Sequence, residues 1–132
     1  MTPALPDILT GQAVALMTPL PPEAGGDYLA GRVGLLAMLA GLAAQEAERG
    51  LAARVWENGA IRALLAEAGG PPVEADEGLT WSALDAANAR LRRVLIAVHE
   101  GAEERGDRTL QAEILELYQQ MAAARRLVLG GG

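Results

Sequence analysis

The sequence has no cysteine, no lysine and no phenylalanine, and aromatic residues make up only 3% of its 132 positions. Without cysteine there is no disulfide, thiolate metal ligand or cysteine nucleophile, and without lysine there is no Schiff-base or P-loop lysine. The shortage of aromatic and β-branched residues argues against an all-β fold. The chain is rich instead in Ala (27 residues) and Leu (21 residues), which favour helices.

The charge of the chain is acidic, with 17 acidic residues, 11 arginines and a net charge of −6. A net negative charge disfavours nucleic acids and anionic membrane surfaces as partners. Residues 1–30 contain no basic residue, so we expect no secretory signal. The longest apolar run, residues 33–44, is shorter than the roughly 20 residues that a membrane span needs. We therefore expect a cytoplasmic protein with a single domain over residues 1–132 and no membrane partner.

The first half of the chain predicts two helices. Apolar residues at helical spacing begin at Leu5, Pro6 suits a first helical turn, and the prolines of a loop near 18–26 end the segment. A second helix is expected from Asp27, as its N-cap, to about residue 49, with Gly50 as its C-terminal stop. Because this helix is apolar around most of its circumference, we expect it at the centre of a bundle.

The second half predicts three or four further helices and a solvated loop near 69–79. Residues 51–68 are helical in pattern but contain the turn signal Asn58-Gly59, so they form either one weakened helix or two short ones. Another helix starts at Thr80 or Ser82 and ends near Gly106, and Asp107 is the expected N-cap of the last one. The tail 130–132 is expected to fray.

Taken together, these segments predict an all-α fold. The expected arrangement is an antiparallel helical bundle of four main helices plus an N-terminal helix, because the long segments are joined by short turns.

The single histidine is the first candidate for chemistry. His99 and Glu103 lie one turn apart on a helix and could bind one metal ion together. A di-iron bundle needs a Glu-x-x-His pair on each of two helices, whereas this chain has Ile96 at the first position and no second histidine. A polar helical turn explains the pair more simply, and we expect no catalytic residue, cofactor or metal.

The arginines and the aromatic residues are candidates for binding. Arginines cluster at Arg90, Arg92 and Arg93 and again at 125–126, which suits either an anion clamp or ordinary pairing along the helices and with their C-terminal dipoles. Aromatic side chains anchor many interfaces but also fill cores. The four aromatic residues of the chain are therefore interface candidates: Tyr28, Trp56, Trp81 and Tyr118.

Two segments carry a resemblance to a known family. Residues 28–50 read YLAGRVGLLAMLAGLAAQEAERG after a Leu-Pro-rich loop at 19–22, and residues 87–91 read ANARL. Residues 19–50 and 87–91 resemble a family of small helical bacterial proteins that are encoded near aminoglycoside-phosphotransferase-like kinases and acyl-CoA dehydrogenases. The sequence has Leu36 and Gln45 where that family has Asn and Arg. The resemblance implies an accessory partner of a kinase-like or acyl-CoA-metabolising enzyme and assigns no catalytic residue.

The function that these observations favour is a non-catalytic helical interaction protein or accessory subunit that self-associates, with a dimer expected. One alternative is an acidic, chaperone-like protein that binds a partner's amphipathic helix in an apolar groove. Another is a small-ligand or metal-binding bundle with an enzymatic role, for which Glu46, Arg90, His99 and Glu103 are the candidate residues.

Overall fold

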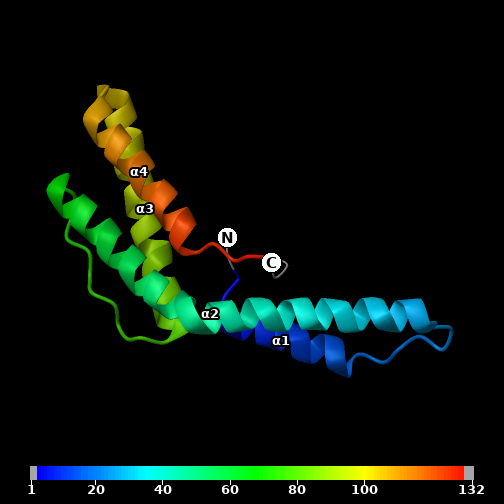
Figure 1. The fold of residues 1–132 in the computed structure, drawn as a ribbon. Helices are drawn as coiled ribbons and strands as arrows, with labels where there is room; N and C mark the ends of the chain where they lie inside the picture. Colours follow the sequence, from blue (N-terminus) through cyan, green and yellow to red (C-terminus); the bar gives the residue numbers. More distant parts are fainter. Residues whose placement is uncertain (1–2, 130–132) are drawn as a thin grey trace. The chain divides into compact units, whose positions relative to one another are not determined.

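A computed structural model describes residues 3–129 of the chain (Figure 1). This part is helical, with four helices and no strand: α1 (Leu5–Met17), α2 (Gly26–Glu67), α3 (Trp81–Arg105) and α4 (Arg108–Ala124). The all-α fold predicted from the composition is therefore confirmed. The tail 130–132, for which we expected fraying, lies outside the described residues.

The prediction of a helix end at Gly50 is wrong, since α2 continues through it to Glu67. Residues 51–68 are thus neither a separate helix nor two short ones, and the described chain has four helices rather than the expected five. The turn signal Asn58-Gly59 also lies inside α2. Its local preference is overcome because the Asn58 side chain is fully buried and hydrogen-bonded, including a bond from Nδ2 to the Leu84 carbonyl (3.2 Å).

Local signals set several other helix ends as expected. Pro6 lies in the first turn of α1, and Thr80 caps α3 by accepting a hydrogen bond from the amide of Ala83 (3.2 Å). The Asp107 carboxylate accepts one from the amide of Leu110 (3.1 Å) and caps α4. Gly106 joins α3 to α4 in the left-handed conformation (φ 67°), which favours glycine. Asp27 is not the N-cap of α2, because that helix starts one residue earlier.

The described chain divides into two compact units. Unit 1 comprises Met1–Gly50 and Leu127–Gly132, and unit 2 comprises Leu51–Arg126. The boundary between them falls inside α2, so this helix contributes its first part to unit 1 and its second part to unit 2.

Unit 2 has an apolar core of its own. The second part of α2 packs there with α3 and α4, and α3 and α4 lie side by side (Figure 1). The core residues are Ile61, Leu65, Leu91, Leu95, Ala102, Leu110, Ile114, Leu117 and Met121. Within each helix most of them recur three or four residues apart, so the packing of unit 2 follows the helical spacing of apolar residues in the sequence.

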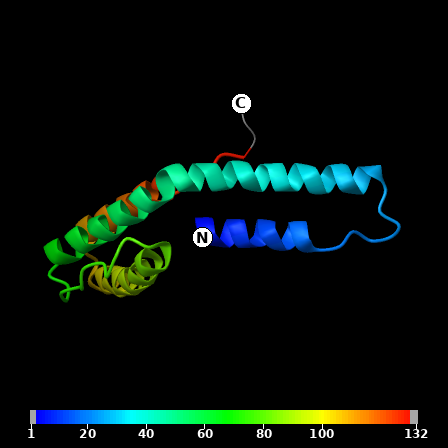
Figure 2. The ribbon, with the colours of Figure 1, turned by 90° about the horizontal axis from the view of Figure 1, so that it is seen from below.

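Unit 1 buries little of its apolar surface. Its helix α1 runs alongside the first part of α2 (Figures 1 and 2), and Gln12 Nε2 of α1 donates a hydrogen bond to the Leu36 carbonyl of α2 (3.1 Å). Leu29 and Val33, which the periodicity assigns to the core, are 49% and 58% exposed. The expectation of a central helix therefore fails for this part of α2 within the described chain, because α1 covers one side of it and Val128 contacts it only near Gln45.

Candidate functional site

A buried carboxylate organises the polar interior of unit 2. Glu57 on α2 is completely buried. Its Oε1 accepts hydrogen bonds from Asn88 Nδ2 (2.7 Å) and Arg92 Nη2 (2.7 Å) on α3, and its Oε2 accepts one from Arg125 Nε (2.7 Å) at the end of α4. One α2 side chain thus holds the other two helices of the unit through charge-assisted hydrogen bonds, which are stronger than neutral ones.

The network continues along α2 to the loop between α2 and α3. Asn58 Nδ2 donates to Asp76 Oδ1 (3.1 Å), and its Oδ1 accepts from Asn88 (3.0 Å). Arg62 Nη2 also donates to Asp76 Oδ1 (2.7 Å), and its Nε donates to the Glu74 carbonyl (3.0 Å). The loop residues 74–76 are therefore fastened to α2 by three side-chain hydrogen bonds.

The electrostatics of Asp76 reflect this fastening. The hydrogen bond from Arg62 lowers the pKa of the Asp76 carboxyl below its ordinary value, and the charge of Arg62 and the bond from Asn58 act in the same direction. Desolvation opposes them, but the pKa remains lowered. Asp76 is therefore held as a carboxylate that ties the loop to the helix.

A second ion pair links α2 to the start of α3. The guanidinium of Arg54, which is almost fully buried, donates from Nε to Asp85 Oδ1 (2.7 Å) and lies 4.7 Å from the ring centroid of Trp81. Asp85 lies three residues after Ser82, and its carboxylate binds this arginine. Trp81 is the first residue of α3, and its ring forms a cation–π contact with Arg54 of α2.

The chemistry available to this network is limited by its own hydrogen bonds. Both oxygens of Glu57 already accept bonds from cationic groups, so the carboxylate is not arranged as a base for a substrate. The arrangement suits the fixing of three helices relative to one another. Such a buried network specifies one packing because each polar group needs its partner.

Sequence reasoning missed most of this network. Arg92 and Arg125 pair across helices with Glu57, a partner that neither interpretation of the arginine clusters named. One signal was present, since Asn88 interrupts the apolar stripe that runs from Leu84 to Leu91 on α3. A polar residue on an inward stripe predicts a buried partner.

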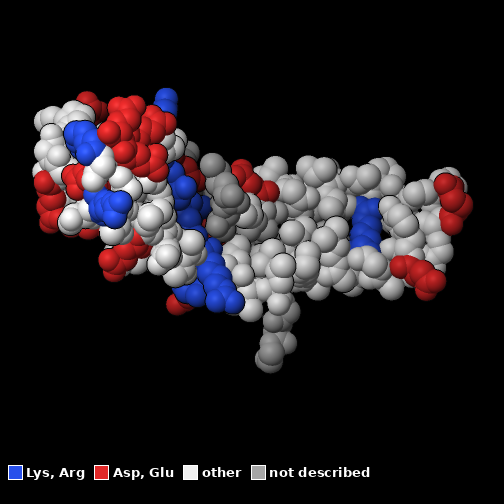
Figure 3. Space-filling view, turned by 90° about the horizontal axis from the view of Figure 1, so that it is seen from above, with Lys and Arg blue, Asp and Glu red and all other residues white. Residues whose placement is uncertain are grey.

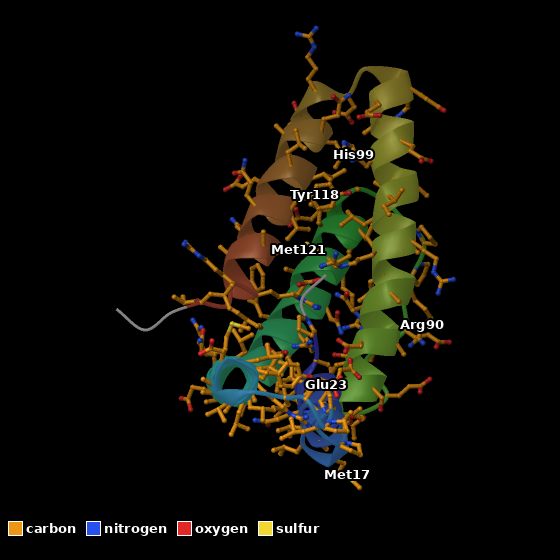
Figure 4. The ribbon with its side chains drawn as sticks, turned by 90° about the vertical axis from the view of Figure 1, so that its right-hand side faces the viewer. Met17, Glu23, Arg90, His99, Tyr118 and Met121 are labelled. Atoms are coloured by element: carbon orange, nitrogen blue, oxygen red, sulfur yellow. The ribbon has the colours of Figure 1, made fainter. Side chains whose placement is uncertain are left out.

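His99 lies near two other polar residues. Its Nε2 is 3.4 Å from Glu103 Oε1, and its Nδ1 is 3.5 Å from the hydroxyl of Tyr118 on α4 (Figure 4). Among the described residues, no group of three or more acidic or histidine side chains is placed to hold a metal ion. Desolvation raises the pKa of the Tyr118 hydroxyl, and the tautomer of His99 decides which of the two groups donates in this contact.

The remaining candidates are spread over the two units. Tyr28 in unit 1 is 53% exposed and Trp56 in unit 2 is 42% exposed, so both remain available for contacts, whereas Trp81 and Tyr118 have the contacts given above. Arg90 is exposed, and it precedes His99 on α3 by about 13 Å of helix rise (Figure 4). Glu46, which belongs to unit 1, is buried.

Most of the exposed large apolar side chains of the described chain lie on unit 1. A space-filling view shows few charged atoms over its helices (Figure 3). The exposed large side chains on this unit are Leu9, Val14, Leu16, Met17, Leu20, Tyr28, Leu29, Val33, Leu35, Met38, Val128 and Leu129. By length and composition alone, α2 could cross a membrane, and only 6% of its most apolar 18-residue window is buried.

A shallow groove lies on the same unit. Its volume is about 490 Å³, and it is lined by Ala15, Thr18, Asp27, Tyr28, Gly31, Arg32 and Leu35. Arg32 crosses from α2 to α1 there, with Nη2 donating to the Thr18 carbonyl (2.7 Å). The groove is thus a mixed polar and apolar surface.

The chain matches no protein-family model, no curated protein and no solved structure.

Proposed function

We propose that this chain is a non-catalytic helical interaction protein that self-associates through unit 1. The observation that carries the proposal is the exposed apolar surface of that unit. Contiguous apolar patches of this kind mark interaction sites in soluble proteins, because their transfer from water to a partner's surface is favourable.

The two units support this division of roles. Unit 2 combines an apolar core with a buried polar network, whose charged groups bind one another. Unit 1 has two helices whose buried apolar residues are Ala4, Ile8 and Ala43. Two helices alone bury too little surface to offset the entropy of ordering them, so unit 1 is stabilised when another surface covers it.

The self-association would complete the antiparallel helical bundle that the sequence favours, with helices from two chains. The resemblance of residues 19–50 and 87–91 points to a kinase-like or acyl-CoA-metabolising enzyme as a further partner. The acidic charge of the chain fits a cytoplasmic protein that acts on neither nucleic acids nor membranes.

Native mass spectrometry and sedimentation velocity of the full chain test the self-association. We expect a particle of twice the 13.7-kDa chain mass at micromolar concentration, with dissociation on dilution. A strict monomer up to high concentration contradicts the proposal. A stoichiometric small-molecule adduct that is lost on denaturation would favour a ligand-binding function instead.

A further inference from the structure

The two helices of unit 1 form a hairpin with two distinct faces. At about 100° per residue, the side of α1 nearest α2 is centred on Ile8 and Gln12, and the facing side of α2 is centred on Arg32 and Leu39. The two helices run in opposite directions. Side chains that lie about 90° around each helix from its contact side, counted in the direction of increasing residue number, therefore project from the same face of the hairpin.

One of these faces is uncharged, and we call it the apolar face. Its residues are Leu5, Leu9, Ala13 and Leu16 of α1 with Leu29, Val33, Leu36 and Ala40 of α2. The larger side chains at its centre remain open to solvent in this chain, with Leu9 48%, Leu16 63%, Leu29 49% and Val33 58% exposed.

The opposite face is polar at several points and is partly occupied by the chain itself. It contains the groove, where Arg32 binds the Thr18 carbonyl. Farther along α2, the side chain of Gln45 forms two hydrogen bonds with the backbone of Val128. Its Nε2 donates to the Val128 carbonyl (2.9 Å), and its Oε1 accepts from the Val128 N–H (2.8 Å). The backbone of Val128 thus covers part of this face, and we take the apolar face as the one left for a partner.

We propose that the apolar face docks against the same face of a second copy of this chain, so that two hairpins close a four-helix bundle. This inference rests on the proposed self-association and names its surface. A two-fold interface requires a self-complementary patch, and a flat face without charge meets this requirement because no like charges are brought together. Leucine and valine then interdigitate as the core of an ordinary bundle.

The size of the face lies near the lower limit for such a dimer. The 13-residue helix α1 is about 20 Å long, and two adjacent helices are roughly 20 Å wide. The flat outline is therefore about 400 Å² per copy, and the relief of the side chains increases the accessible area. Two copies together approach the roughly 1,000 Å² that a specific interface needs.

A second hairpin fits this face better than a bilayer does. Helix α1 is about 20 Å long, whereas the hydrocarbon layer is about 30 Å thick. The loop between the helices carries Glu23, with Asp27 in the following turn. If the hairpin entered a bilayer, both carboxylates would have to cross the membrane or stay at its surface. The loop has no basic residue that would bind anionic lipids there.

Matched substitutions on the two faces test the inference. Leu9→Glu and Val33→Glu place a carboxylate on the apolar face, and Val14→Glu and Met38→Glu place one on the opposite face of the same helices. All four side chains are at least 44% exposed, so none of the changes removes core packing within the chain. Circular dichroism of each variant checks that it remains helical.

We expect the two apolar-face variants to weaken dimerisation by about 100-fold or more, because each dimer would bury two carboxylates. The two opposite-face variants should remain dimeric. A dimeric wild type that is disrupted by Val14→Glu and Met38→Glu but not by Leu9→Glu and Val33→Glu overturns the docking face and leaves self-association standing. A monomeric wild type overturns both the docking face and the proposed self-association. If that monomer floats together with neutral phosphatidylcholine vesicles in a density gradient, the apolar face binds lipid instead.

Discussion

At the scale of single residues, Glu57 determines how unit 2 packs. A buried carboxylate loses its hydration, and this cost is offset only when cationic groups and hydrogen-bond donors surround it. Arg92, Arg125 and Asn88 provide these groups from two other helices. Replacing Glu57 therefore leaves Asn88 and Arg125 without the carboxylate that they bind in the interior, and Arg92, whose side chain is 41% exposed, loses its ion pair.

We expect Glu57→Gln to lower the free energy of unfolding by about 3 kcal/mol, because the mostly buried Arg125 and the partly exposed Arg92 lose the carboxylate charge that they bind. Urea denaturation monitored by circular dichroism measures the change. Glu100→Gln makes the same chemical change at an exposed position and is the control. A loss for Glu57→Gln no larger than that of the control would show that the network contributes little to stability.

Asp76 gives the stability a dependence on pH. Its pKa in the folded chain is lowered, chiefly by the bond from Arg62, so the unfolded chain binds a proton at higher pH than the folded chain does. The stabilisation by Asp76 is therefore fully present above the pKa of the unfolded carboxyl and is lost as the pH falls through the lowered pKa. Wild type should exceed Asp76→Asn in stability at neutral pH, and the gap should close on acidification.

Denaturation of both proteins at a series of pH values tests this expectation. The same comparison in an Arg62→Gln background is the control, because the largest cause of the shift is then removed. A gap that stays constant as the pH falls would contradict the assigned cause.

At the scale of elements, α2 shows that local breaking signals are weak against tertiary contacts. Glycine within a helix costs about 1 kcal/mol relative to alanine, a loss that buried contacts in the same helix can offset. Asn58, whose side chain is enclosed by unit 2, provides such contacts. Gly106 is different, because its positive φ is itself the feature that ends α3.

Two glycines should therefore respond in opposite ways to the same substitution. A Cβ added at Gly59 meets no atom within 4 Å, so Gly59→Ala should stabilise the protein by about 0.5–1 kcal/mol. Gly106→Ala should destabilise it by about 1 kcal/mol, because alanine is strained at φ 67°. Thermal denaturation compares the two variants, and a change of the same sign in both would refute the argument.

At the scale of the whole molecule, the two units differ in how their stability arises. Unit 2 has a continuous core and polar groups bound within it, whereas much of the apolar surface of unit 1 faces solvent. Under the proposed association, dimerisation stabilises unit 1 by mass action, since a partner that binds only the folded chain shifts the folding equilibrium. In such a protein, the fraction of chains with a folded hairpin would rise with the protein concentration.

The sequence by itself determined the all-α fold, the ends marked by Pro6, Gly106 and Asp107, and the inward residues of unit 2. These follow from local chemistry: helix propensity, capping and the 3.6-residue period act within a few positions of each other.

Only the tertiary structure decided that α2 continues past Gly50 and Asn58-Gly59, that Arg92 and Arg125 bind Glu57, and that Leu29 and Val33 stay exposed. Periodicity shows which side chains share a face, but it does not show which element covers that face. For α2 the same apolar pattern is covered in unit 2 and open in unit 1, because burial depends on neighbours that lie far away in the sequence.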